Sequence, residues 1–168
     1  CRRTYPHTLR LRRPWRTSSS FPPFLERCDK MEITMRPIAT MRSDFPTKFG
    51  IPRQSGLVES LHSTIIFEPA FRNPDALRGI EGFSHLWLLW CFSENVEKGS
   101  SPTVRPPRLG GNRRVGVFAT RSPFRPNPIG LSCVKLESVE KRETGITLIV
   151  SGADLLDGTP IDEWYTYL

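Results

Sequence analysis

Six arginines within residues 104–131 are the side chains of this sequence best suited to binding an anion. They are Arg105, Arg108, Arg113, Arg114, Arg121 and Arg125. No acidic residue lies among them, and prolines and glycines recur through the stretch. A guanidinium group offers a planar fork of donors that matches a carboxylate or phosphate, and its flat face stacks on rings. The stretch therefore predicts a loop that holds a carboxylate, a phosphate or an adenine.

Short strands are expected to position this loop. Apolar runs bounded by Pro, Gly or Ser predict strands at residues 36–41, 63–67, 84–92, 115–120, 130–139 and 146–150. The last two form a hairpin, and residues 69–78 form one short helix that opens at Asn73-Pro74. Strands at regular spacing with few helices are typical of a sandwich or barrel, so we expect a mostly β fold.

The run from Gly116 to Ser132 resembles the signature of the TsaA/TrmO family, and outlying pieces match in the family's order and spacing. These pieces are residues 52–54, 82–87, 105–107, 110–112 and 157–160. Members of that family are S-adenosylmethionine-dependent tRNA methyltransferases built on a β-barrel. The resemblance covers residues from about 35 to 161. It implies a small TsaA-like barrel with few short helices, S-adenosylmethionine as cofactor and tRNA as partner.

The resemblance also implies a cofactor site assembled from separate pieces. Its expected residues are Pro52, Arg53, Gln54, Arg121, Ser122, Asn127, Leu131, Asp157, Gly158, Thr159 and Pro160. In this reading Asp157 accepts from the amine or ribose, and Thr159 contacts the adenine edge. Without the resemblance, residues 52–54 would be interpreted as an exposed loop. Asp157-Gly158 alone would be interpreted as a structural turn.

A second expected surface binds RNA. Pro-Pro and Gly-Gly-Asn separate four of the arginines, a pattern that resembles a flexible basic flap. Guanidinium–phosphate contacts position nucleic acid without reading its sequence. We therefore expect the RNA contacts to come from Arg105, Arg108, Arg113, Arg114 and Arg125. The alternative is a solvated basic loop without a partner.

The function implied by the resemblance is methyl transfer to N6 of a threonylcarbamoylated adenosine next to the tRNA anticodon. The family implies a homodimer, and we expect a cytoplasmic protein. No catalytic acid or base can be named, because transfer to an exocyclic amine relies largely on proximity and alignment. Two alternatives stay open: a cofactor- or RNA-binding module without turnover, and a methyltransferase with a different acceptor.

Charge and the family pattern predict the domain boundaries. Residues 1–30 hold eight Lys/Arg against two acidic residues, whereas residues 31–168 hold sixteen against fifteen. We expect residues 1–30 to lie outside the fold, disordered or not native. They are either a transit-like leader or upstream sequence before a start at Met31 or Met35. Residues 31–168 are expected to form the barrel domain, with a C-terminus that is truncated or diverged after Pro160.

The remaining reactive and aromatic residues predict little further chemistry. The four cysteines lack C-x-x-C spacing, so no metal site is expected, and Cys91 and Cys133 are expected to be buried free thiols. No apolar run reaches the roughly 20 residues that span a bilayer. Trp87 and Trp90 are expected in the core, while His85 is either a rim histidine or a site residue.

Overall fold

The computed structural model describes residues 7–9, 33–106, 110–142 and 145–168. The chain divides into two compact units. The barrel unit comprises Pro37–Val96 and Pro128–Leu168, and the other unit comprises Cys1–Arg36 and Glu97–Asn127. Residues 97–127 are called the arginine segment below. Among the described residues, no helix has both the length and the apolar character needed to cross a membrane.

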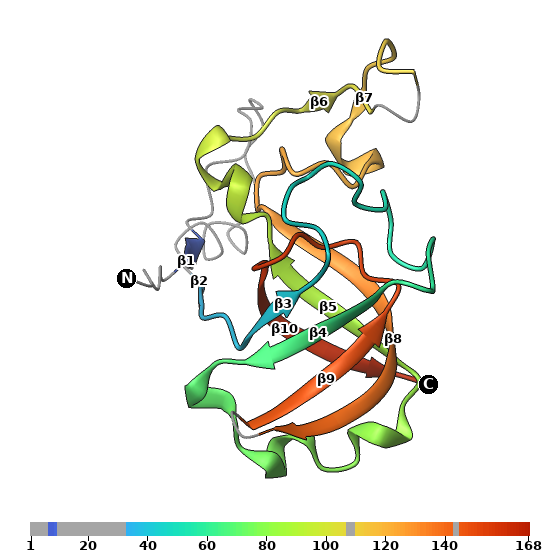
Figure 1. Ribbon diagram of the computed structural model, residues 1–168. Helices are drawn as coiled ribbons and strands as arrows, with labels where there is room; N and C mark the ends of the chain where they lie inside the picture. The colour runs from blue at the N-terminus through green and yellow to red at the C-terminus, as the bar shows by residue number, and fades with distance from the viewer. Residues whose placement is uncertain (1–6, 10–32, 107–109, 143–144) are drawn as a thin grey trace. The chain divides into compact units, whose positions relative to one another are not determined.

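Six antiparallel strands make up the barrel unit. They are β3 (Ala39–Arg42), β4 (His62–Phe67), β5 (His85–Cys91), β8 (Ile129–Arg142), β9 (Gly145–Ser151) and β10 (Pro160–Tyr167). They are hydrogen-bonded in the order β10-β3-β4-β9-β8-β5. Because β10 also pairs with β5, the sheet closes into a barrel (Figure 1). The predicted mostly β class is therefore confirmed.

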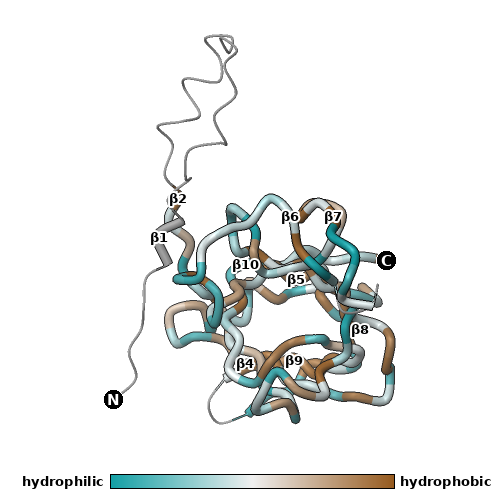
Figure 2. The backbone as a smooth tube through the Cα atoms, turned by 90° about the horizontal axis from the view of Figure 1, so that it is seen from above, coloured by the Kyte–Doolittle hydropathy of each residue, from teal (hydrophilic) through white to brown (hydrophobic). Residues whose placement is uncertain are grey.

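Alternation along the strands fills the barrel with apolar side chains. On β5, Leu86 and Leu88 are fully buried and Trp90 is 8% exposed, whereas Trp87 between them is 37% exposed. Successive strand residues point to opposite faces, so Trp87 faces outward and its predicted place in the core is wrong. Figure 2 looks down on the ring of strands and shows the apolar stretches along them.

Short 3₁₀ helices connect the strands. The predicted helix at residues 69–78 is two such turns, η1 (Pro69–Phe71) and η2 (Pro74–Leu77). Asn73 caps η2, because its side-chain oxygen accepts from the backbone N–H of Asp75 at 3.0 Å. A third turn, η3 (Ile80–Gly82), precedes β5. Leu77 and Ile80 are buried in the core, so these turns stabilise the barrel.

The C-terminal segment, where the sequence departs from the family pattern, forms β10 and completes the barrel. Trp164 packs edge-on against Phe67, with ring centroids 5.2 Å apart. The register of β10 against β5 shifts between Ile161 and Glu163, which leaves Asp162 as an inserted residue. Pairing with β5 continues to Tyr167. Divergence in sequence has therefore not removed the strand that closes the sheet.

The other unit contains two small two-stranded sheets. β1 (His7–Leu9) pairs with β2 (Ile33–Met35), and β6 (Thr103–Val104) pairs with β7 (Val115–Gly116). The expectation that residues 1–30 lie outside the fold falls largely on residues beyond those described. The predicted strand at 115–120 is wrong after its second residue. The chain there turns into η6 (Val117–Ala119), because both the N–H and the hydroxyl of Thr120 donate to the carbonyl of Val117.

Candidate functional site

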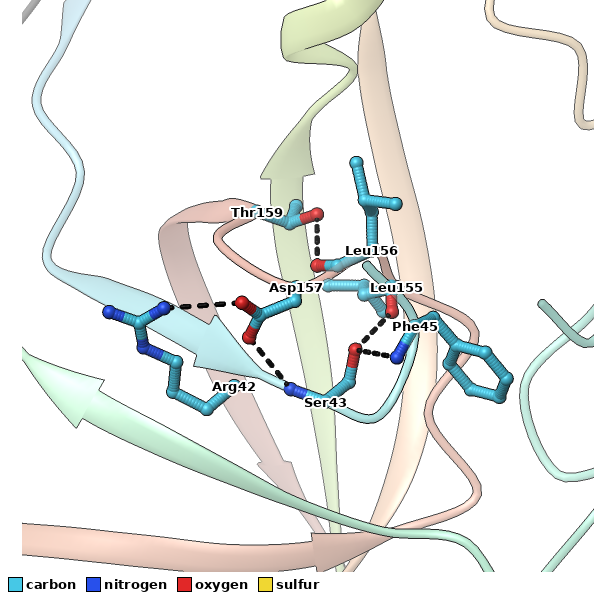
Figure 3. A network of polar contacts seen from close by, with 7 residues as sticks. All are labelled: Arg42, Ser43, Phe45, Leu155, Leu156, Asp157 and Thr159. Carbon is cyan, nitrogen blue, oxygen red and sulfur yellow. Dashed lines mark hydrogen bonds and ion pairs between the residues drawn. The ribbon is translucent and has the colours of Figure 1, made fainter. Parts of the chain in front are cut away.

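The Asp157-Gly158 turn holds the end of β3 (Figure 3). The carboxylate of Asp157 accepts from the backbone N–H of Ser43 at 3.1 Å and from Nη1 of Arg42 at 3.2 Å. The backbone N–H of Asp157 donates to the carbonyl of Phe45 at 2.8 Å. Gly158 has a φ of 80°, a left-handed conformation that favours glycine. The Asp157 carboxylate, expected to contact a ligand, thus already makes two structural contacts.

Thr159 lies under this turn and is 4% exposed. Its hydroxyl donates to the carbonyl of Leu156 at 2.7 Å, and its own carbonyl accepts from the N–H of Met41 at 2.9 Å. Pro160 follows as the first residue of β10 and faces Thr40 in register. The turn is therefore rigid, and a direct adenine contact by Thr159 stays a prediction.

The loop that carries Pro52, Arg53 and Gln54 connects β3 to β4, and it contacts both this turn and β8. Its far end is fixed because the N–H of Cys133 donates to Oγ of Ser55 at 3.1 Å. The next residue, Gly56, donates to the carbonyl of Gly152 at 2.9 Å. Arg53 and Gln54 are exposed, and Pro52 is half-buried. Both ends of this loop are thus anchored while its polar side chains face solvent.

Leu131 lies on β8, two residues before the strand residue that anchors the loop, and is 45% exposed. The barrel unit thus carries one group of the expected cofactor residues. This group consists of Pro52, Arg53, Gln54, Leu131, Asp157, Gly158, Thr159 and Pro160. Arg121, Ser122 and Asn127 belong to the other unit.

In the arginine segment, hydrogen bonds fix the backbone around Arg121 and Ser122. Val117 is fully buried, and its N–H donates to the carbonyl of Pro102 at 3.0 Å. The N–H of Ser122 donates to Oγ1 of Thr120 at 3.1 Å, and Oγ of Ser122 accepts from the N–H of Phe124 at 3.3 Å. The Ser122 hydroxyl keeps its own proton for donation. This loop is a preformed donor surface rather than a random coil.

Arg125 contacts the backbone of the same loop. Its Nη1 donates to the carbonyl of Thr120 at 2.7 Å, and its guanidinium carbon lies 5.8 Å from the ring centroid of Phe118. This geometry gives Arg125 a structural partner that the sequence did not reveal. Its predicted RNA contact stays a prediction.

Three of the remaining arginines that are expected to bind RNA flank the strands β6 and β7, which together form a ribbon. Arg105, Arg113 and Arg114 are exposed, and Nη1 of Arg114 donates to Oγ1 of Thr103 at 3.4 Å. Arg108 lies outside the described residues. Gly110 and Gly111 adopt φ values of 79° and 72°, so two left-handed residues turn the chain between the strands. The ribbon therefore presents at least three guanidinium groups to solvent.

Charge is divided between the parts of the chain. The arginine segment holds seven Lys/Arg against one Glu, a net charge of +6. The barrel unit holds eight Lys/Arg against thirteen Asp/Glu, a net charge of −5. The near-neutral balance of residues 31–168 therefore hides a basic segment inserted into an acidic barrel. A polyanion such as RNA would be attracted to the segment.

The residues present suit a zwitterionic ligand. Oδ1 of Asn127 is buried and has no hydrogen-bond partner among the residues that the structure describes. A buried acceptor of this kind is satisfied when a ligand donates to it, as an amine or a ribose hydroxyl does. Arg121, an exposed residue of the same unit, carries a guanidinium group that matches a carboxylate. These donors and acceptors fit the polar groups of S-adenosylmethionine.

A buried polar chain near β5 was not foreseen from the sequence. Nε1 of Trp90 donates to Oγ of Ser132 at 3.0 Å, and that hydroxyl donates to Oδ1 of Asp154 at 2.5 Å. Ser132 is fully buried. Gly130 faces Trp90 in register, and a Cβ at that position would lie 2.2 Å from the indole. Nothing in the sequence distinguished these residues from ordinary strand positions.

Cys91 is a buried free thiol, as predicted, and Cys133 is a half-buried free thiol. Burial raises the pKa of Cys91 to about 11, with a further contribution from the nearby carboxylate of Asp162. Burial also raises the pKa of Cys133. Both thiols are therefore held in the protonated form at neutral pH, which makes them poor nucleophiles.

His85 is half-buried at the start of β5. Its Nδ1 lies 2.8 Å from Oγ of Ser84, and its ring lies edge-on to Tyr167 with centroids 6.5 Å apart. These contacts favour the rim histidine over the site residue. In the described part of the chain, no three His, Cys, Asp or Glu side chains gather as metal ligands would.

These features define a class of small antiparallel β-barrels in which the candidate ligand-binding residues lie on anchored loops and on a basic insertion. The chain belongs to the family described as the tRNA-methyltransferase O N-terminal domain, whose model matches residues 40–167. The resemblance noted in the sequence is therefore confirmed. The matched range includes every residue expected to bind cofactor or RNA.

Individual relatives agree with this assignment. The chain is 50% identical over 131 residues to tRNA (adenine(37)-N6)-methyltransferase of Escherichia coli K12, covering 78% of this chain and 56% of that protein. The crystal structure of TrmO from Pseudomonas aeruginosa superposes with a TM-score of 0.65 at 40% identity, covering 82% of this chain and 57% of that one. The chain thus spans little more than half the length of these relatives.

A shorter relative matches over most of its length. It is the probable S-adenosyl-L-methionine-binding protein of Methanothermobacter thermautotrophicus, 38% identical over 131 residues. The alignment covers 78% of this chain and 87% of that protein. A protein of nearly the extent of this domain is therefore named for cofactor binding.

Proposed function

We propose that this chain is the catalytic domain of an S-adenosylmethionine-dependent tRNA methyltransferase. Its acceptor is N6 of the adenosine next to the anticodon, in the threonylcarbamoylated form, and it acts in the cytoplasm. The observation that carries this proposal is the family match over residues 40–167, together with 50% identity to a tRNA (adenine(37)-N6)-methyltransferase. The +6 charge of the arginine segment supports an RNA substrate.

The cofactor is proposed to bind to the arginine segment. Arg121 would supply guanidinium donors to its carboxylate, and Ser122 and Asn127 would bind its amine or ribose. When bound, S-adenosylmethionine supplies an activated methyl group. The protein's part is to hold the acceptor nitrogen in line with that methyl group and to exclude water.

The direct test incubates the chain with S-adenosylmethionine and total tRNA that lacks the methyl group. Digested nucleosides are then analysed by mass spectrometry. The proposal expects methylated threonylcarbamoyladenosine and no methylation of plain adenosine. Methylation of another nucleoside would show that the proposed acceptor is wrong, while the assignment as a tRNA methyltransferase would stand.

A binding module without turnover is the second candidate, favoured by the name of the Methanothermobacter relative. Calorimetric titration with S-adenosylmethionine separates the two candidates when it is paired with the tRNA assay. Binding with a measurable affinity but no transfer to any nucleoside would favour the module. Absence of cofactor binding would overturn both candidates.

The enzyme is further proposed to act as a homodimer through the outward face of β5 and β10. Trp87 and Tyr165 face each other in register there, at 37% and 63% exposure. Two neighbouring exposed aromatic rings provide apolar area that a second copy would bury. Light scattering should give a dimer for the parent and a monomer for Trp87→Ser. A monomeric parent would reject this assembly.

A further inference from the structure

Phe118 is an aromatic side chain displayed on the strongly basic arginine segment. It is 68% exposed on η6, which directly follows β7 in the arginine segment. A large apolar side chain at this exposure gives up the free energy that burial would provide. An exposed ring also has a flat π-face on which another ring stacks. Its exposure therefore suits a ligand that is itself flat and apolar on its face.

The structure fixes Phe118 in place. On one side of it in the sequence, Val117 is fully buried; on the other, Thr120 closes the turn through its N–H and hydroxyl. Arg125 lies over the ring, and its guanidinium is itself held by the carbonyl of Thr120 at 2.7 Å. A fixed ring loses little conformational entropy when a ligand stacks on it. The residue is thus preorganised rather than merely unburied.

The surrounding charge selects the kind of partner. The segment that carries Phe118 has a net charge of +6, and Arg113 and Arg114 directly precede β7, which leads into η6. Exposed aromatic rings beside guanidinium groups are the common means by which proteins hold unpaired bases, with the rings stacking and the cations following the phosphates. Phe49 is also exposed, beside Lys48, but it belongs to the acidic barrel unit.

We propose that Phe118, backed by Arg125, is a stacking platform for an unpaired base of the tRNA anticodon loop. This inference rests on the proposed function for its RNA partner. It names Phe118 as a positioning residue that holds the loop while the neighbouring adenosine is methylated. Sequence reading assigned RNA contact to arginines alone, whereas this platform adds an uncharged contact to them.

The test measures binding of a synthetic anticodon stem–loop RNA that carries 2-aminopurine at an unpaired loop position. Stacking quenches this fluorophore, so the parent chain should reduce its emission. Phe118→Ala and Phe118→Leu should raise Kd by roughly 5- to 100-fold and abolish the quenching, as expected when an aromatic ring no longer stacks on a base. Phe118→Trp should retain both. Phe71→Ala removes a half-exposed ring from the barrel unit and serves as the matched control.

A salt series distinguishes stacking from charge. Because Phe118 carries no charge, Phe118→Ala should shift the plot of log Kd against log salt without changing its slope. Unchanged RNA binding by Phe118→Ala overturns the platform. So does a loss of S-adenosylmethionine affinity with RNA binding intact, since the ring would then stack on the cofactor.

Activity separates this inference from the proposed function. A parent that binds the stem–loop through Phe118 but methylates no tRNA would refute the methyltransferase and keep the platform. If the parent methylates tRNA and Phe118→Ala is equally active and binds RNA with equal affinity, the methyltransferase stands and the platform is refuted. Thermal melting of each variant checks that exposed substitutions leave the fold intact.

Discussion

The barrel and the arginine segment differ in charge and in what holds them together. The barrel carries a net charge of −5 and nearly all the buried apolar side chains. In the described part of residues 97–127, Val117 is the single buried aliphatic residue, and side-chain hydrogen bonds to the backbone order the loop. The residues that stabilise the fold thus lie in the barrel, whereas the residues that would attract a polyanion lie in the arginine segment. Changes in one region should leave the property of the other intact.

The largest change in stability should come from adding a side chain at Gly130, where the indole of Trp90 already occupies the space. A Cβ there would lie 2.2 Å from Cε2 of Trp90, so the indole must move. Gly130→Ala should destabilise the barrel by about 3 kcal/mol, the upper end for overpacked cores. For a protein of this size, that lowers Tm by roughly 6–12 °C. Thermal unfolding followed by circular dichroism measures the change.

Gly116 provides the matched control in the arginine segment. It has a φ of −61°, and an added Cβ would meet nothing within 4 Å. Gly116→Ala should therefore change stability by no more than about 0.5 kcal/mol. Equal melting of both variants would break the distinction between a packed barrel and an open segment.

Arg121 should affect ligand binding without affecting stability. Loss of a charged donor to a ligand carboxylate costs about 1.5–3 kcal/mol. Arg121→Ala should therefore weaken S-adenosylmethionine binding by roughly 10- to 100-fold. Calorimetric titration measures this, with Arg78→Ala as the control because Arg78 is exposed and paired with Asp75 on the barrel. Parent-like affinity would remove Arg121 from the cofactor site.

Alkaline pH should destabilise the barrel through Cys91. Its pKa of about 11 in the folded protein exceeds the ordinary value of 9.0, so the folded state keeps a proton that the unfolded state releases. Stability is therefore complete below pH 9 and falls as the pH rises toward 11, by an amount on the order of 2 kcal/mol. Urea unfolding across this range should show a shallower decline for Cys91→Ala. Parallel declines would show that other groups cause the loss.

Neutralising the ribbon should weaken RNA binding while stability stays constant. Arg113→Gln and Arg114→Gln together should reduce the salt slope of tRNA binding by roughly 0.7–0.9 for each phosphate that is no longer neutralised. Filter binding across a salt series measures the slope. An unchanged slope would reject the ribbon as an RNA contact, and a lowered Tm would show that these arginines also stabilise the fold.

Removal of residues 1–30 should have the smallest effect. This segment has uncompensated positive charge and little apolar content with which to offset the entropy of ordering. We expect unchanged Tm and unchanged cofactor affinity, even though β1 is removed with the segment. A fall of more than a few degrees would show that the pairing of β1 with β2 contributes to stability.

The sequence predicted the strands correctly where apolar runs were clearly bounded by Pro, Gly or Ser. β4, β5 and the β8–β9 hairpin lie within one or two residues of their expected positions at most of their ends. β5 was located correctly, but its unbroken apolar run concealed which residues face outward. The error at Trp87 follows from this, because only neighbouring strands decide which face is covered. β10 was missed because its residues depart from the family pattern, although they still pair with β5.

The sequence could not predict which side chains contact residues that lie far away along the chain. The sequence identified Asp157 and Arg125 as reactive types, but not their bonds to Ser43 and to the Thr120 carbonyl. The expected strand through Val117 is another example. Val, Phe and Thr favour strands, yet the Thr120 hydroxyl bonds back to Val117 and closes a turn. Local preference was overridden by one side chain.

The strand pairing at the base of the insertion has a consequence for how long the insertion can be. Cys91 and Ile129 face each other in register, and the N–H of Phe92 donates to the carbonyl of Pro128 at 2.8 Å. The excursion between them starts and finishes at adjacent points of a closed sheet. Loop-closure entropy grows only logarithmically, by about 0.6 kcal/mol for each doubling of length. An insertion twice as long should therefore cost the barrel little stability, provided that its two ends still meet at these adjacent strand residues.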